Sequence, residues 1–420
     1  MFKSTRNLPA KMLTLWLYQY VTMTSISTPK ISLQNYRQQF LALANKAYFN
    51  YGGQGPMPQV ALDAIQQAYV QIQQLGPFSS QSYAWVVAAA DQARSTIAAE
   101  LGTTPQTITL TENVSAGCNI ALWGMEWRSG DHLLISDCEH HSVVATVQEV
   151  QRRFGVEVSV CPLQATVNGD DSIAVIERHL RPNTRLVVLS HILWNTGQIL
   201  PIADIATLCH SYPSREPIRV LVDAAQSVGL LPLNLDQLQA DFYAFTGHKW
   251  WCGPEGVGGL YVRPAAMESL QPTFLGWRGV TVDGAGQPVG WKPDGRRYEM
   301  ATSAYPLYSG LRAAIAQHHQ WGTAQERFQR IQMLSQLLWQ QLCDLSGVVC
   351  VRSTPPEAGL VSFQLPDKSH DQLVKQLETN GLMIRAIPSP DCVRACLHYL
   401  TLESEVDLLV EAIRQFMQKA

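Results

Sequence analysis

Short apolar runs rich in β-branched and aromatic residues recur along the middle of the chain and alternate with helical patterns. The runs predict seven strands, at Thr107–Glu112, His132–Asp137, Val156–Pro162, Arg185–His191, Arg219–Asp223, Phe242–Phe245 and Gly258–Arg263. The patterns between them predict helices near Ser115–Trp127, Val143–Phe154, Asp171–Leu180 and Ile202–His210. Strands that alternate with helices in this way predict an α/β fold with a mostly parallel seven-stranded sheet, covered by helices on both faces.

The pattern changes after Val280. The stretch Thr281–Arg297 is rich in Gly and Pro and predicts a long loop. One long helical pattern follows from about Tyr308 to Leu345, and short strands and helices complete the chain. We therefore expect a large domain over residues 51–305 and a smaller α+β domain formed by residues 29–50 and 306–420.

The beginning of the chain is set apart by its charges. Residues 1–22 contain Lys3, Arg6 and Lys11, no acidic residue and an apolar patch that is too short to span a bilayer. A signal peptide or targeting segment is the alternative, but Gln19 and two tyrosines interrupt the patch. We interpret residues 1–28 as a disordered extension or as translation from an upstream start, with Met23 as the natural first residue.

Composition narrows the class of protein. The 420 residues are 46% hydrophobic and 15% charged, with a formal net charge of −3, so no basic excess favours nucleic acid or an anionic membrane. The nine cysteines form no C-x-x-C pair and no zinc-ligand spacing. Unpatterned thiols of this kind predict a reduced, cytoplasmic protein without a metal site.

Lys249 follows Thr246-Gly-His at the end of a predicted strand. By position alone it is a surface lysine, but open α/β sheets bind ligands at this edge, and an amine there can form a Schiff base with an aldehyde. Asp223 ends the preceding strand and would reach the same edge after one crossover. It could cap a helix, bind magnesium or pair with a protonated pyridine nitrogen. No phosphate loop of the magnesium-binding type accompanies it.

Further residues could bind the remaining parts of such a ligand. Ser115, Ala116 and Gly117 open a helix after a strand, where backbone N–H groups favour an anion, although Ser115 could equally be a helix cap. Thr246 and His248 could add phosphate contacts. His140 could stack on an aromatic ring or serve structure alone. Arg385 and Arg394 could bind a substrate carboxylate bidentately, or form surface ion pairs.

In combination, these motifs resemble the class V, cysteine desulfurase-like branch of the fold-type I pyridoxal-phosphate (PLP) enzymes. The resemblance covers about residues 50–400, and its most specific part is Asp223-Ala-Ala-Gln226 followed by Thr246-Gly-His-Lys249. Within the branch the chain is similar to the L-cysteine/cystine C–S lyases. The shared segments are Cys118–Gly124, Leu193–Gln198, Ala244–Trp250, Ala301–Pro306 and Pro390–Cys396.

The resemblance implies a role for each of these residues. Lys249 would hold PLP as a Schiff base, Asp223 would pair with the pyridine nitrogen, His140 would stack on the ring, and Gln226 would lie near the ring hydroxyl. The expected phosphate contacts are Ser115, Ala116, Gly117, Thr246, His248 and, from the neighbouring subunit of a homodimer with shared sites, Thr302. The expected substrate contacts are Arg385, Arg394, Asn195 and Trp277.

One departure separates two related activities. A desulfurase passes sulfur to a cysteine on a mobile loop, whereas here eight residues separate Arg385 from Arg394, and Cys392 lies at what looks like the entry of a strand. We therefore expect β-elimination of cystine or cysteine to pyruvate, ammonia and a persulfide or sulfide, with a sulfur acceptor as a candidate partner. The alternatives are a desulfurase or selenocysteine lyase that forms alanine, a racemase or epimerase, and a non-catalytic PLP-fold binding protein.

Overall fold

The computed structural model describes residues 32–418. The proposed N-terminal extension, residues 1–28, lies outside the described residues. No helix within residues 32–418 is both long and apolar enough to pass through a bilayer. The same part of the chain contains no cluster of three or more His, Cys, Asp or Glu side chains suited to a metal ion.

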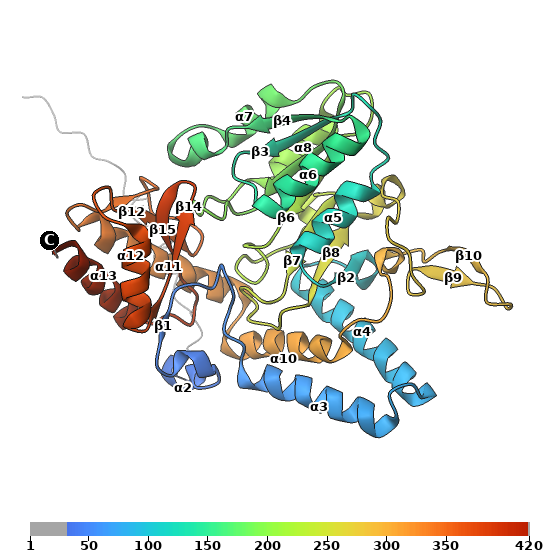
Figure 1. Cartoon of the computed structure of the whole chain (residues 1–420), viewed down its shortest axis with the longest axis horizontal. Helices are drawn as coiled ribbons and strands as arrows, with labels where there is room; N and C mark the ends of the chain where they lie inside the picture. Colours follow the sequence, from blue (N-terminus) through green and yellow to red (C-terminus); the bar gives the residue numbers. More distant parts are fainter. Residues whose placement is uncertain (1–31, 419–420) are drawn as a thin grey trace, which may run out of the picture.

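A seven-stranded sheet forms the centre of the larger part of the molecule (Figure 1). Its order is β2-β8-β7-β6-β5-β3-β4, and every neighbouring pair is parallel except those that β8 makes. The strands are β2 (Ile108–Thr111), β3 (His132–Ser136), β4 (Glu157–Cys161), β5 (Thr184–Ser190), β6 (Arg219–Asp223), β7 (Phe242–Thr246) and β8 (Gly258–Val262). The predicted mostly parallel sheet is confirmed.

Both faces of this sheet are buried, which explains the nearly continuous apolar runs. Along β5, Val187 and Leu189 belong to one core cluster while Leu186 and Val188 belong to the cluster on the other face. Side chains alternate in this way because successive residues of a strand point to opposite faces. The helices that follow the strands are α5 (Val114–Gly124), α6 (His141–Phe154), α7 (Ser172–His179), α8 (Ile202–Ser211) and the short α9 (Leu235–Leu238).

A second, four-stranded antiparallel sheet lies beside the large one (Figure 1). Its order is β11-β12-β15-β14, with strands β11 (Val349–Cys350), β12 (Leu360–Gln364), β14 (Arg385–Pro388) and β15 (Asp391–Cys396). It packs with the helices α11 (Ala324–Cys343), α12 (His370–Thr379) and α13 (Glu403–Gln418). The N-terminal segment joins this body, because β1 (Ala47–Tyr48) pairs with β13 (Leu382–Met383) and Phe49 enters the same core.

Three further helices pack against one another beside the large sheet. The helix α10 (Tyr305–Trp321) packs against α3 (Gln59–Leu75) and α4 (Ser80–Glu100), while the five-residue α2 (Leu33–Arg37) lies near the second sheet. Leu311 and Ile315 of α10 belong to a core cluster of the large sheet. The expected boundary between the large and small domains, at residues 305 and 306, lies at the start of this helix. This division into domains stays a prediction.

Two expectations from the sequence were wrong. The helical pattern from Tyr308 to Leu345 is two helices. The helix α10 ends at Trp321 with Gly322 as its C-cap, and Thr323 is the N-cap of α11 and forms a capping box with Glu326. The segment Thr281–Arg297 is not only a loop. It contains most of a hairpin, β9 (Val280–Val282) and β10 (Pro288–Trp291), which projects from the body in Figure 1.

Candidate active site

The carboxyl ends of three neighbouring parallel strands define one edge of the large sheet. Ser190 at the end of β5 is in register with Asp223 at the end of β6, and Asp223 is in register with Ala244 of β7. Lys249 follows three residues after β7. The parallel topology therefore brings Asp223 and Lys249 to the same edge, as the single crossover between them predicts.

Lys249 is half-buried, and its charge is disfavoured. Burial lowers the pKa of Lys249 to about 8, and the Asp223 carboxylate acts in the opposite direction while Arg394 lowers the pKa further. A lysine with this pKa is partly neutral near physiological pH. It can therefore act as a nucleophile toward an aldehyde and as a base, which an ordinary surface lysine cannot do efficiently.

Asp223 is a buried carboxylate with little compensation from the protein. Its side chain is 5% exposed, and Oδ1 accepts a hydrogen bond from the Ala225 N–H over 2.9 Å. Burial raises the pKa of Asp223, because the neighbouring amide and Lys249 offset the loss of hydration only in part. A cationic partner at this point would favour the ionised form of the carboxylate and so act against the effect of burial.

His140 lies before α6 as its N-cap, and its Nδ1 accepts from the Ser142 N–H over 3.3 Å. Burial lowers the pKa of His140 to about 4, and the positive charges of His141, Lys249 and Arg385 act in the same direction. The ring is therefore neutral at physiological pH. It also contacts the Trp194 ring edge-on, with 5.9 Å between centroids, so the orientation of His140 is fixed from two sides.

The first turn of α5 carries the three residues expected to bind a phosphate. Asn113, not Ser115, is the N-cap, because its side chain accepts from the Ala116 N–H over 2.9 Å. The Gly117 N–H donates to the Asn113 carbonyl, and a Cβ on Gly117 would come within 2.9 Å of Ala244 Cβ. Gly117 thus permits close packing of the helix. The Ser115 hydroxyl donates to the Ser142 hydroxyl over 3.2 Å.

Two further expected phosphate contacts are linked to each other. Thr246 Oγ1 and His248 Nδ1 are 2.6 Å apart, and burial lowers the pKa of His248. The imidazole and the hydroxyl hold each other in place through this hydrogen bond. Thr246 ends β7 and His248 follows it in the loop that carries Lys249, so a phosphate bound to them would lie on the lysine side of the edge.

Gln226 is oriented by two partners. Its Oε1 accepts from the Trp250 indole N–H over 2.9 Å, and its Nε2 donates to the Gly52 carbonyl over 3.0 Å. Because an indole only donates and a carbonyl only accepts, these contacts fix which way the amide points. Sequence reasoning missed Trp250 and Gly52, although the run Tyr51-Gly-Gly53 is a visible signal of a close backbone approach.

The second sheet supplies the opposite wall. Arg385 and Arg394 are in register on β14 and β15, and both influence the charge of Lys249. Arg394 is 1% exposed; one nitrogen donates to the Trp194 carbonyl over 2.6 Å, whereas its Nε and second terminal nitrogen have no partner within residues 32–418. Asn195 donates to the Ser389 carbonyl over 3.0 Å, and its buried Oδ1 is likewise unpaired there.

Trp277 and Thr302 lie at a different place in the chain. Both line a cavity of about 590 Å³ with the exposed side chains of Phe78 and Tyr83, and none of Lys249, Asp223 or His140 lines it. Thr302 also lines a cavity of about 240 Å³ together with Ala116 of the phosphate-side helix. Within one chain, then, the structure does not bring Trp277 to the lysine edge.

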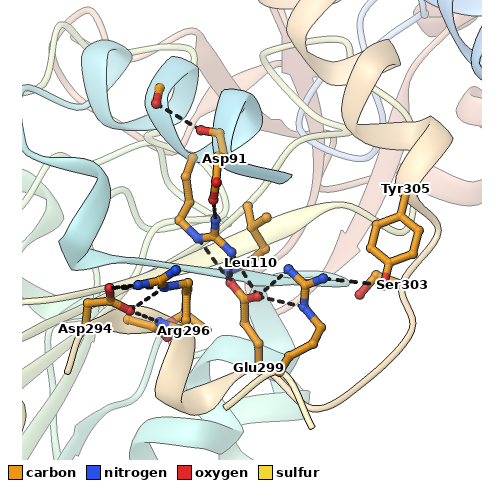
Figure 2. A network of polar contacts seen from close by, with 12 residues as sticks. Asp91, Leu110, Asp294, Arg296, Glu299, Ser303 and Tyr305 are labelled. Atoms are coloured by element: carbon orange, nitrogen blue, oxygen red, sulfur yellow. Dashed lines mark hydrogen bonds and ion pairs between the residues drawn. The ribbon is translucent and has the colours of Figure 1, made fainter. Parts of the chain in front are cut away.

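The segment that carries Thr302 is held by a charge network that the sequence did not reveal (Figure 2). Glu299 is 5% exposed and accepts from Arg94 of α4 over 2.8 Å and from Arg278 over 2.9 Å. It also accepts from the Leu110 N–H over 3.1 Å. Because two cations and an amide converge on one carboxylate, the backbone just before Thr302 is fixed to the large sheet.

Glu139 is a second residue to which sequence reasoning assigned no role. It lies beside His140, is buried, and accepts from the Ser190 N–H over 3.0 Å and the Ser190 hydroxyl over 2.8 Å. Burial raises the pKa of Glu139 to about 7, and the nearby Asp223 acts in the same direction. The side chain therefore ties the loop after β3 to the end of β5, directly behind the candidate site.

These features agree with a comparison against known families. Residues 47–414 match the family model for class-V aminotransferases, so the chain belongs to that family, whose members depend on PLP. The family membership and the fold class expected from the motifs are confirmed. Among curated proteins, the chain is 28% identical to isopenicillin N epimerase of Streptomyces clavuligerus, over 87% of this chain and 93% of the epimerase.

Solved structures give a higher similarity. The cystine C–S lyase C-DES, in complex with its reaction product cysteine persulfide, is 47% identical, with a TM-score of 0.88 over 90% of this chain and 99% of that one. Another C-DES structure, a lysine-to-alanine mutant with glycine covalently linked to the PLP cofactor, has a TM-score of 0.89 at 47% identity, over 90% of this chain and 98% of that one. A probable cysteine desulfurase of Methanothermobacter thermautotrophicus is 28% identical over 77% of this chain and 82% of that protein.

Proposed function

We propose that this chain is a PLP-dependent C–S lyase that cleaves L-cystine or L-cysteine by β-elimination, forming pyruvate, ammonia and a persulfide or sulfide. The observation that carries the proposal is the buried Arg394 guanidinium, whose unpaired nitrogens lie on the wall opposite the Lys249 edge. Buried unpaired donors are costly, and an amino-acid carboxylate is a matching acceptor. The likeness to the cystine C–S lyase C-DES supports the same substrate class.

The residues present fit PLP. Lys249 has the lowered pKa that capture of the cofactor aldehyde requires, and Asp223 is a buried carboxylate whose raised pKa calls for a cation such as a protonated pyridine nitrogen. The neutral His140 ring would lie against the cofactor ring, and Gln226 would serve the ring hydroxyl. The proposed phosphate contacts are Ser115, Ala116, Gly117, Thr246, His248 and Thr302.

When bound, PLP supplies an electron sink for the charge that develops at the substrate Cα. Arg394 would bind the substrate α-carboxylate, with Asn195 next to it, and so orient the Cα–H bond. Lys249 would remove the Cα proton, because a lysine whose pKa is about 8 is a competent base near neutral pH. The Asp223 carboxylate would hold its negative charge beside the ring. The released aminoacrylate would hydrolyse to pyruvate and ammonia.

Cystine suits the site better than cysteine for two reasons. A persulfide leaves more readily than a thiolate, and cystine carries a second carboxylate. Arg385 is exposed, is in register with Arg394, and influences Lys249, so it lies where a second carboxylate could be bound. The persulfide would then pass to a separate sulfur acceptor.

The position of Cys392 favours a lyase over a desulfurase. Cys392 is completely buried within β15, and only Ser389 and Pro390 connect β14 to β15. Burial raises the pKa of its thiol to about 11. A sulfur-accepting cysteine must be exposed and mobile, so persulfide transfer through Cys392 is disfavoured.

We also propose a homodimer in which Thr302 and Trp277 reach the partner's site. The cavity they line is rimmed by large exposed aromatic side chains, with Phe78 fully exposed and Trp277 48% exposed. Apolar surface of this kind marks an association site. We place the enzyme in a reducing compartment such as the cytoplasm, because all nine cysteines are free.

The deciding experiment is a product assay with cystine and cysteine side by side. We expect a yellow protein whose cofactor borohydride fixes to Lys249, and pyruvate as the product, formed faster from cystine. Alanine in place of pyruvate would establish the desulfurase or selenocysteine-lyase alternative instead. A colourless protein that borohydride does not modify would support the non-catalytic alternative.

A further inference from the structure

Two of the nine cysteines differ from the rest in exposure. Seven are buried, whereas Cys343 is exposed and Cys350 is half-buried. Their sulfur atoms are 3.6 Å apart, which is van der Waals contact between thiols. The pair lies on the second sheet's body and takes no part in the site described above.

The backbone holds the two thiols together. Cys343 is the last residue of α11 and Cys350 the last of β11, and the short connection turns at Gly347, whose φ is 80°. Val348 and Leu345 of this connection are buried, and the Trp339 indole of α11 donates to the Arg352 carbonyl over 2.9 Å. A disulfide needs a sulfur separation of about 2 Å, so the two sulfur atoms have to approach each other by about 1.5 Å.

We propose that Cys343 and Cys350 form a thiol–disulfide exchange site that reduces small disulfides of the cystine class and closes an intramolecular disulfide. The Cys343 thiolate attacks one sulfur of cystine, the cystine S–S bond breaks, and one cysteine leaves and takes up a proton. Cys350 then attacks Cys343 Sγ, the mixed disulfide breaks, and the second cysteine leaves. Two protein thiols are oxidised and one cystine is reduced to two cysteines.

The surroundings assign a different role to each sulfur. Cys343 is the attacking residue because it is the exposed one. Burial raises the pKa of Cys350, and the adjacent Cys343 sulfur acts in the same direction, so Cys350 acts only after the mixed disulfide has formed. Because a helix C-terminus disfavours a thiolate, we expect exchange over minutes to hours with excess disulfide, not within seconds.

The Cys343–Cys350 disulfide would affect the contact between the part of the molecule built on the second sheet and the part built on the large sheet. The chain that leaves β11 binds Asn168 next to the large sheet: Asn168 donates to the Val351 carbonyl over 3.0 Å and accepts from the Ser353 N–H over 2.8 Å. A disulfide at Cys350 would join this contact covalently to the end of α11. Oxidation is therefore expected to raise the melting temperature of the holoenzyme.

The test uses the holoenzyme and two probes, excess oxidised glutathione and excess L-cystine, followed by alkylation and peptide mass spectrometry. We expect a Cys343–Cys350 crosslink with either probe, the loss of two hydrogens from the intact mass, and seven alkylatable thiols of nine after unfolding without reductant. A lasting mixed disulfide on Cys343 beside a free Cys350, a crosslink between other cysteines, or no modification would each overturn the proposal.

Two variants sharpen the result. Cys350→Ser should trap the mixed disulfide on Cys343, and Cys343→Ser should abolish the modification, while both keep the elimination rate of the wild type. Oxidised glutathione makes the outcome independent of the proposed function. An enzyme that forms no pyruvate but closes the bridge contradicts only the lyase proposal, and an active enzyme that does not close it contradicts only this inference.

Discussion

The two walls of the candidate site differ in how completely their polar atoms are paired. On the lysine side, Asp223, Gln226 and the Thr246–His248 pair all have partners within the protein. On the arginine side, Arg394 and Asn195 keep buried atoms without a partner in the described chain. Each unpaired buried polar group costs roughly 1–3 kcal/mol. We therefore propose that the lysine wall is preorganised for the cofactor and that the arginine wall is kept open for a substrate that comes and goes.

The largest effect is expected from the lysine wall itself. Lys249→Ala should remove the covalent attachment of PLP and lower the elimination rate at least about 10³-fold, because both the anchoring amine and the base are lost. Borohydride reduction followed by peptide mapping, together with a pyruvate assay, measures the two effects. Lys375→Ala, on the surface of α12, is the matched control. A yellow, active Lys249→Ala enzyme would refute the assignment.

Substitutions in the arginine wall should change the Michaelis constant, KM, for the substrate. Arg394→Ala removes a buried, charge-assisted contact, so we expect KM to rise roughly 100-fold, or about 3 kcal/mol, with PLP still bound. Arg385→Ala should raise KM only for cystine, roughly tenfold, because cysteine has no second carboxylate. Steady-state kinetics with both substrates test this. If both substitutions raised the KM for cysteine equally, Arg394 and Arg385 would not bind two different carboxylates of the substrate.

Glu139 tests whether ionisation of a buried carboxyl group next to the lysine wall makes the stability of the protein depend on pH. The pKa of Glu139 is raised in the folded protein from 4.5 to about 7. Its stabilising contribution is therefore complete below about pH 4.5 and is lost as the pH rises through 7. Relative to Glu139→Gln, the wild type should lose up to about 3 kcal/mol of unfolding free energy between pH 4.5 and pH 8. Urea unfolding measures this difference, with Glu378→Gln on the surface as the control.

Gly52 tests the distance between the walls. A Cβ there would lie 2.7 Å from Cys396 Sγ, 2.9 Å from Gln226 Oε1 and 3.1 Å from an Arg394 nitrogen. Gly52→Ala should therefore push the Gln226 and Arg394 side chains apart and raise KM about tenfold, with a smaller change in PLP affinity. Gly169→Ala, where a Cβ meets nothing within 4 Å, is the control. An unchanged KM would mean that the Gln226 and Arg394 side chains can move apart without affecting substrate binding.

The smallest effect is expected at Cys392. Because this thiol is buried in β15, Cys392→Ser should leave the rate of pyruvate formation within about twofold of the wild type. A desulfurase would instead lose its activity. Comparison of product and rate for the two proteins on the same cystine solution separates these outcomes.

The sequence by itself determined the large sheet and the residues at its edge. Short, nearly continuous apolar runs mark strands that are buried on both faces, and the order of strands and helices leaves few topologies, so Asp223 and Lys249 were expected to meet at one edge. Position and chemistry also singled out His140 and the two arginines, and the family resemblance then implied their roles. Local patterns did not resolve the break at Gly322 or the hairpin at β9 and β10, because a capping box and a short exposed strand pair are weak signals within longer periodic stretches.

Tertiary structure alone decided how the site is built around those residues. Gly52 and Arg394 are far apart in sequence, and only folding brings them into contact. The lowered pKa of Lys249 and the raised pKa of Glu139 both arise from burial, which depends on every segment packed around them. The sequence thus determined which groups reach the edge of the large sheet, because strand order is encoded locally. Their protonation and spacing were decided by contacts between distant segments, which no local pattern contains.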